Sequence, residues 1–255
     1  MSAEDVLNVR QLGMRLEDAT TSERLEALEE LQRLSRHLPV LVCAETLGRL
    51  MQVLQERGSS EEYLECLYVL DALVRCRETG AADARRNAAQ LLDEHEHVET
   101  LLDLLLHADP AVGVAASQVL TALHEADDTR LEALIQECPD GMNKLLQLLP
   151  ARGDGGSREA VRDQALVLVQ QLTRSNVEMM KTVVFNEGFD TLFSIVQAEY
   201  DAGTCRYYYY YYYYYYYCYY YYYYYYYYYY YYYHYYHYYY HYFYYYCSHC
   251  CGRAS

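Results

Sequence analysis

The sequence is short of basic residues. Lysine and arginine together number 20, against 36 aspartates and glutamates, and the formal net charge is −16. A protein that binds the phosphate backbone of a nucleic acid needs a stripe of basic side chains, so this balance argues against a nucleic-acid partner. It favours a soluble protein whose partners are other proteins.

Long apolar runs are also missing from residues 1–206. A transmembrane helix needs about eighteen or more consecutive apolar residues, and no uncharged run of that length occurs there. Residues 2–5 (SAED) are acidic, whereas the start of a secretory leader is basic. We therefore expect a cytoplasmic protein without a secretory leader or a membrane span.

The sequence patterns of catalytic sites are absent as well. We find no glycine-rich phosphate loop after a strand, no GxSxG, no HExxH and no kinase motifs. The histidines before residue 207 are scattered without a recurrent partner. We therefore expect no enzymatic activity and no cofactor. The scattered histidines are His37, His95, His97, His107 and His124.

Metal-binding patterns are weak. The cysteines of the first 206 residues are widely spaced without a CxxC pair, which is typical of small buried hydrophobic residues in a cytosolic chain. Residues 247–251 (CSHCC) contain a CxxC but no second ligand pair. Residues 94–97 (EHEH) alternate, and alternation does not gather ligands on one helical face. For them we expect a solvated loop or helix extension. The widely spaced cysteines are Cys43, Cys66, Cys76 and Cys138.

Tryptophan is absent, and nearly all the tyrosine lies in one tract at residues 207–246. All 35 tyrosines of this tract are encoded by TAY, and the codons of its few interruptions differ from TAY by one base. This pattern is typical of a translated trinucleotide repeat. A disordered tail and an aggregation-prone segment are the alternatives. The interruptions are Cys218, His234, His237, His241 and Phe243.

A five-residue pattern of two apolar, one polar and two apolar residues recurs along the chain. It occurs at residues 50–54 (LMQVL), 101–105 (LLDLL), 145–149 (LLQLL) and 192–196 (LFSIV), so the intervals are 51, 44 and 47 residues. We call it the first signature.

A second signature of apolar or small residues spaced three apart precedes each copy of the first. Spacings of three and four place side chains on one face of a helix. Two signatures that return in phase every 44 to 51 residues are typical of an armadillo or HEAT α-solenoid. We expect an all-α solenoid of about four repeats; an ordinary helical bundle is the alternative. The second signature consists of Leu28/Leu31/Leu34, Leu67/Leu70/Leu73, Ser117/Leu120/Leu123 and Leu166/Val169/Leu172.

Turn and capping residues separate the expected units. Thr21 and Ser22 could cap a helix that runs through His37 and ends before Pro39. Residues 58–60 (GSS) and 150–157 mark boundaries between units. The last unit that we expect leaves its apolar face without a cap, which predicts poor solubility of the isolated array.

The most specific stretches are residues 161–163 (VRD), 172–176 (LTRSN) and 181–189 (KTVVFNEGF). With the apolar helix expected at residues 165–172, they resemble the armadillo-like head of the general vesicular transport factor family, the Golgi vesicle-tethering or docking proteins. The resemblance covers about residues 4–200. It indicates a partial head domain at 1–206. Composition adds the low-complexity tyrosine segment at 207–246 and an unstructured end at 247–255.

The resemblance implies a non-enzymatic head that engages a Rab-type GTPase and the tethering and fusion machinery on ER–Golgi and Golgi membranes. Such a protein would be peripheral to the membrane and bound through protein partners. The matching motif carries Arg174, Ser175, Asn176 and Lys181, which are candidate interaction residues. Ser175 or Asn176 could instead cap the next helix. An armadillo-type scaffold or adaptor outside trafficking is the alternative function.

Family members have a longer head, followed by a dimerising coiled coil and an acidic carboxyl terminus. In this sequence no heptad segment follows the repeats. Dimerisation and long-reach tethering are therefore not expected from the sequence as it stands.

Overall fold

The structure, a computed structural model, describes residues 3–18, 20–56, 58–76, 80–149, 157–186 and 188–201. The chain divides into two compact units, Met1–Ile195 and Val196–Ser255, and the second is described only as far as Asp201. The tyrosine tract and the end of the chain lie outside the described residues. The described part forms α1 (Ala3–Asp18), α2 (Thr21–Ser35), α3 (Pro39–Gln55), α4 (Ser60–Arg75), α5 (Ala81–Leu91), α6 (His95–Leu104), α7 (Pro110–Ala126), α8 (Asp128–Glu137), α9 (Gly141–Leu148), α10 (Ser157–Ser175), α11 (Val177–Phe185) and α12 (Gly188–Asp201).

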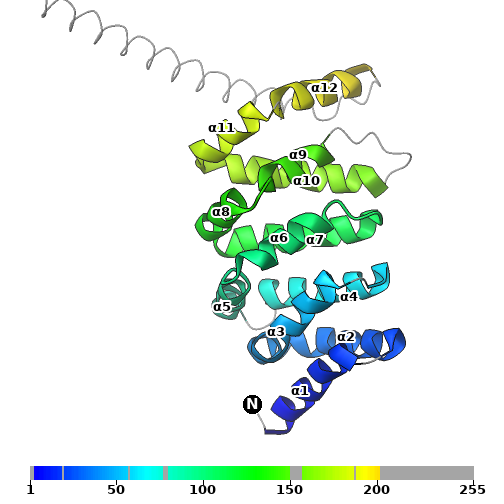
Figure 1. The fold of residues 1–255 in the computed structure, drawn as a ribbon. Helices are drawn as coiled ribbons and strands as arrows, with labels where there is room; N and C mark the ends of the chain where they lie inside the picture. Colours follow the sequence, from blue (N-terminus) through cyan, green and yellow to red (C-terminus); the bar gives the residue numbers. More distant parts are fainter. Residues whose placement is uncertain are drawn as a thin grey trace, which may run out of the picture. The chain divides into compact units, whose positions relative to one another are not determined.

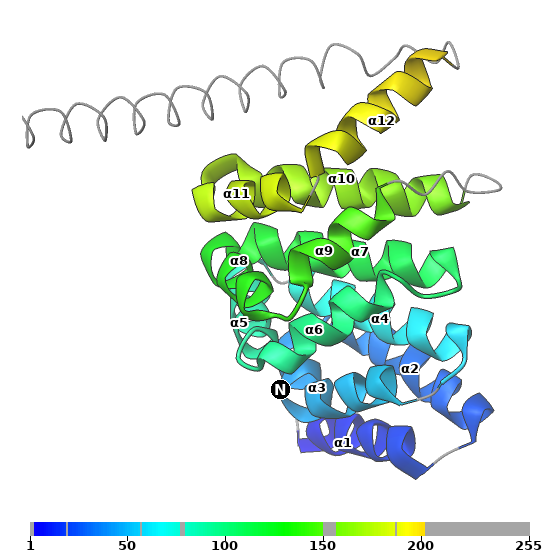
Figure 2. The same cartoon turned by 45° about the horizontal axis from the view of Figure 1, so that its top comes forward.

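The helices of the first unit stack in chain order (Figures 1 and 2). Helices α2, α4, α7 and α10 each pack on the next and form one layer, and we call them the ladder helices. Helices α1, α3, α6 and α9 form a second layer beside them. Helices α5, α8 and α11 lie along one edge of the stack, on the left in both views.

Both signatures fall where a solenoid requires them. The second signature lies on the four ladder helices, and the first lies on α3, α6, α9 and α12. In α4 the residues Leu67, Leu70 and Leu73 are at most 1% exposed. The described residues contain helices and no strand, which confirms the armadillo-like α-solenoid predicted from the repeats.

Two of the predicted helix boundaries were wrong. Helix α2 is capped by Thr20, whose backbone N–H and hydroxyl donate to the Glu23 carboxylate at 3.0 and 2.9 Å. This helix ends at Ser35, and Pro39 begins α3 instead of ending α2. Proline suits the first position of a helix because its missing N–H would have no partner there.

The polar stretch between the first two copies of the first signature contains an additional helix, α5. Asn87 of this helix is 1% exposed, and its side-chain N–H donates to the Leu73 carbonyl at the end of α4, at 2.9 Å. Residues 94–97 were expected to form a solvated loop or helix extension. Glu94, His95 and Glu96 are exposed, as expected, but the exposure expected for His97 was wrong. This histidine lies in the first turn of α6 at 6% exposure, with Nδ1 3.0 Å from the Leu91 carbonyl oxygen.

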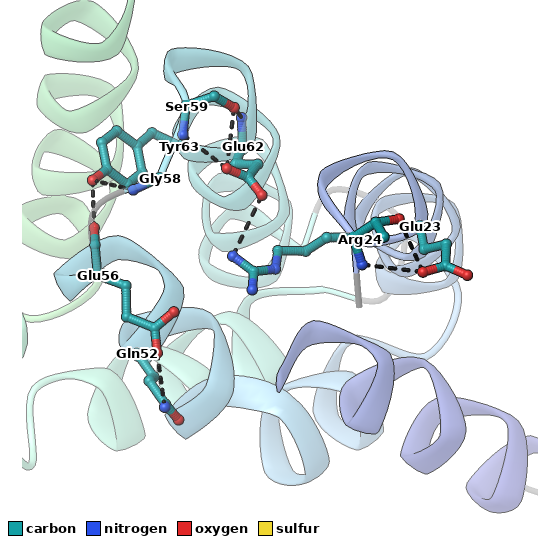
Figure 3. Close-up of polar contacts among 9 residues, drawn as sticks. Glu23, Arg24, Gln52, Glu56, Gly58, Ser59, Glu62 and Tyr63 are labelled. Carbon is teal, nitrogen blue, oxygen red and sulfur yellow. Dashed lines mark hydrogen bonds and ion pairs between the residues drawn. The ribbon is translucent and has the colours of Figure 1, made fainter. Parts of the chain in front are cut away.

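Polar contacts also join successive repeats, in addition to the apolar contact between their helices. Arg24 of α2 reaches the Glu62 carboxylate of α4 at 3.4 Å, and the Glu62 side chain is 4% exposed (Figure 3). Glu62 also accepts the Ser59 N–H at 2.8 Å, which closes a capping box at the start of α4. Further along, Lys144 of α9 pairs with Asp103 of α6 at 2.5 Å.

The four widely spaced cysteines are buried, as predicted. Burial raises the pKa of the Cys43 thiol to about 12 and also raises the pKa of Cys66. These thiols therefore stay protonated at neutral pH and pack as small apolar groups. None of the helices in the described residues combines the length and the apolar composition that a membrane span requires.

The second residue of the first signature is buried in three copies of the signature and exposed in the fourth. Met51, Leu102 and Leu146 are 2%, 0% and 6% exposed, whereas Phe193 on α12 is 58% exposed. We predict that Leu102→Ala lowers the free energy of unfolding by about 2–5 kcal/mol because it opens a cavity. Phe193→Ala, at the same repeat position, should cost less than about 1 kcal/mol. Urea unfolding followed by helical circular dichroism measures both, and equal losses would contradict this account.

Candidate interaction surface at the junction of α10 and α11

The four candidate residues lie around the turn between α10 and α11. Arg174 is exposed in the last turn of α10, Asn176 lies between the two helices, and Lys181 is exposed on α11. The side chain of Ser175 lies outside the described residues. The structure therefore places the candidates at one junction but gives them different surroundings.

Asn176 caps α11. Its side-chain oxygen accepts the backbone N–H groups of Glu178 and Met179, both at 3.1 Å. These N–H groups belong to the first turn of the helix, where no carbonyl is available to them. Asn176 therefore has a structural role, which was one of the two interpretations open from the sequence.

Asn176 also connects its repeat to the preceding repeat. Its side-chain N–H donates to Glu132 Oε2 on α8 at 2.8 Å, and Gln136 Nε2 of α8 donates to Asn176 Oδ1 at 3.4 Å. Glu132 is only 7% exposed, and its other oxygen lies 3.5 Å from His124 Nε2 on α7. A buried carboxylate is costly without partners. The amide of Asn176 supplies one hydrogen bond from the turn before α11, and the imidazole of His124 lies close to the other oxygen.

Lys181 lies on an exposed strip of α11. It pairs with Glu178 of the same helix at 2.8 Å, and its side chain is 50% exposed. Val177 and Phe185, four residues before and after it, are 51% and 81% exposed. A spacing of four keeps these side chains on one side of the helix. Lys181 is thus a cation between two exposed apolar groups.

Arg174 belongs to a different surface. Arg174 follows Leu166, the first member of the second signature on α10. Arg75 on α4 and Glu125 on α7 follow the first members of their signatures by the same number of residues. Arg75 and Glu125 form an ion pair at 3.7 Å across neighbouring ladder helices. Arg174 is exposed at this position of α10, whereas Asn176 caps α11.

Sequence reasoning missed Glu132 and Gln136. They lie 44 and 40 residues before Asn176, and no motif links them to it. The described residues contain no group of three or more His, Cys, Asp or Glu side chains that could hold a metal ion. The junction exposes Arg174, Lys181 and the apolar side chains of Val177 and Phe185.

The stacked helices define an armadillo-like α-solenoid, a class of protein that presents long surfaces to its partners. No family model matches the chain. Golgin candidate 6 of Arabidopsis thaliana is 35% identical over 143 residues, which cover 56% of this chain and 15% of that protein. General vesicular transport factor p115 of Homo sapiens is 28% identical over 190 residues, which cover 69% of this chain and 19% of that protein.

Intracellular protein transport protein uso1 of Schizosaccharomyces pombe is 27% identical over 199 residues, 75% of this chain and 18% of that protein. The chain is thus homologous to vesicle transport factors, which confirms the resemblance to the general vesicular transport factor family. It spans less than a fifth of the length of these relatives.

Solved structures agree with this fold. The crystal structures of Uso1-1 and Uso1-2 superpose with TM-scores of 0.65 and 0.64 at 18% and 17% sequence identity. The superpositions cover 78% and 75% of this chain, and 34% and 32% of those chains. At this identity the similarity establishes the fold of the array.

The contacts of Asn176 predict how substitutions at the junction change stability. Asn176→Ala should lower the free energy of unfolding by about 2–3 kcal/mol, because it removes a helix cap and takes a hydrogen bond from a buried carboxylate. Lys181→Ala, nearby on an exposed ion pair, should change it by no more than about 0.5 kcal/mol. Urea unfolding of both variants tests the difference. A cost for Lys181→Ala as large as that for Asn176→Ala would contradict the assignment.

Proposed function

We propose that the chain is a protein-binding head that takes part in vesicle tethering in transport to and through the Golgi. The observation that carries the proposal is homology to vesicle transport factors over most of the described residues, at 28% identity across 190 residues for the human relative. The proposed partners are a Rab-type GTPase and other components of the tethering and fusion machinery. The chain would meet the membrane through these partners.

The architecture suits this role. Stacked helices present a continuous, rigid surface, so a partner can be held without an enclosed pocket. The junction of α10 and α11 exposes two basic side chains with different surroundings. Arg174 is exposed in the last turn of α10, and Lys181 stands between Val177 and Phe185. We propose Arg174 and Lys181 as partner contacts, with Asn176 holding the junction in place.

The proposal is non-enzymatic. The relatives are named as transport factors and a golgin, and none of these names describes an enzyme. The polar groups at the junction are engaged in helix capping and in joining two units. In this account the chain acts by binding.

A pull-down with the full chain tests the function. We expect the chain to retain Golgi Rab-type GTPases in a nucleotide-dependent way, and to retain tethering subunits from a Golgi extract. Arg174→Glu combined with Lys181→Glu should weaken retention about tenfold, because each reversal places like charges against the partner. Arg85→Glu, an exposed arginine on α5, is the control for altered charge.

The decisive comparison is with a full-length vesicular transport factor as a positive control. If that protein retains the GTPases and tethering subunits while this chain retains neither, the tethering role is wrong. If both bind but the double reversal has no more effect than Arg85→Glu, the role stands and the residue assignment is wrong.

A further inference from the structure

The ladder helices carry a row of exposed residues at one repeat position. The residue that follows the first member of the second signature is Glu29 on α2, Tyr68 on α4, Gln118 on α7 and Val167 on α10. All four side chains are exposed, although the residue before each of them is buried. The row therefore crosses the array on the side of the ladder layer that faces away from the second layer. We call this side the ladder face.

The ladder face exposes apolar side chains away from the ends of the array. Tyr68 is 40% exposed and Val167 is 42% exposed. They lie on α4 and α10, with Gln118 of α7 between them in the row. Tyrosine supplies a large, rigid contact surface at low entropic cost and is enriched at protein interfaces. Contact with an apolar group of a partner would remove the apolar surface of these side chains from water, which is favourable.

The same face carries two neighbouring carboxylates that repel each other. Partial burial raises the pKa of Glu65 on α4, and the charge of Glu29 on α2 raises it further. Among the described residues, the ion pairs include neither of these two carboxylates. The folded chain thus holds like charges on adjacent helices.

Two arginines of the ladder helices already have partners. Arg75 pairs with Asp71 at 2.7 Å, and it donates to the Gln118 carbonyl on α7 at 3.3 Å. Arg33 on α2 pairs with Glu30 at 2.5 Å. A cation of a partner protein would offset the repulsion between Glu29 and Glu65, and the aromatic ring of Tyr68 on the same face can also attract a cation.

We propose that the ladder face binds an extended segment of a partner protein, with lysine or arginine side chains at Glu29 and Glu65 and two apolar side chains, one at Tyr68 and one at Val167. This inference rests on the proposed function and specifies the chemistry of one partner. Ladder helices stand about 8–10 Å apart and an extended chain advances about 3.3 Å per residue. Val167 lies two ladder helices beyond α4, so the apolar group that meets it is about six residues from the groups that meet Glu65 and Tyr68.

Fluorescence anisotropy with synthetic peptides and the full chain tests this. The probe is a peptide of about twelve residues with two lysines, one leucine beside them and a second leucine about six residues further on, made in both chain directions. We expect one of the two to bind, and the same peptide with glutamate in place of lysine not to bind. Glu29→Gln with Glu65→Gln should weaken binding about tenfold, and so should Tyr68→Ser with Val167→Ser.

A matched control separates this site from general attraction to an acidic protein. Glu96→Gln with Glu137→Gln changes the net charge equally but removes exposed carboxylates of α6 and α8. We expect this variant to bind as the unchanged chain does. Equal weakening by both glutamine pairs, or failure of both lysine peptides to bind, overturns the inference.

Thermal unfolding gives a second readout. Glu65→Gln should weaken peptide binding. It should leave the Tm unchanged or raise it, because it removes the repulsion from Glu29. A variant that loses both peptide binding and stability would show a structural role for Glu65 and would contradict the inference. The pull-down of Golgi GTPases and tethering subunits remains a separate test, so this inference can fail while the proposed function holds.

Discussion

The fold depends on the apolar contact between one ladder helix and the next. A helix pair of this kind exposes an apolar stripe that it cannot bury alone, and the stripe is removed from water only when the next unit stacks on it. Leu70 of α4 and Leu120 of α7 are both fully buried in this way. The polar pairs between units lie around this contact. Ion pairs that remain partly exposed contribute little free energy but fix how the units are aligned.

Much of the fold could be predicted because a helix period is a local property. Side chains three and four residues apart share a face whatever lies elsewhere in the chain, so the second signature identified the ladder helices. The burial of His97 and the contact of Asn176 with Glu132 could not be predicted in this way. Both depend on tertiary contacts with other helices and loops, and no local pattern in a single sequence predicts such contacts. The cap at Thr20 was missed because Thr20, Thr21 and Ser22 can all cap a helix, and only the backbone conformation selects one.

The functional conclusions rest on two kinds of observation. An α-solenoid serves many unrelated functions, so the fold alone does not select vesicle tethering. Homology to vesicle transport factors supports the proposed tethering role, whereas the structure distinguishes residues that hold the array together from exposed ones. Asn176 and Glu132 belong to the first group, and Arg174, Lys181 and Tyr68 belong to the second. The boundary could be drawn only from contacts, because the sequence places Arg174 and Asn176 in one motif.

Native-state hydrogen exchange of the full chain tests most directly whether stacking stabilises this fold. An array held by contacts between neighbours should be most protected where a ladder helix has neighbours on both sides. We therefore predict the slowest exchange in α4 and α7, with protection falling towards α1 in one direction and towards α11 and α12 in the other. Uniform protection across all helices, or the strongest protection in α11 and α12, would contradict the account.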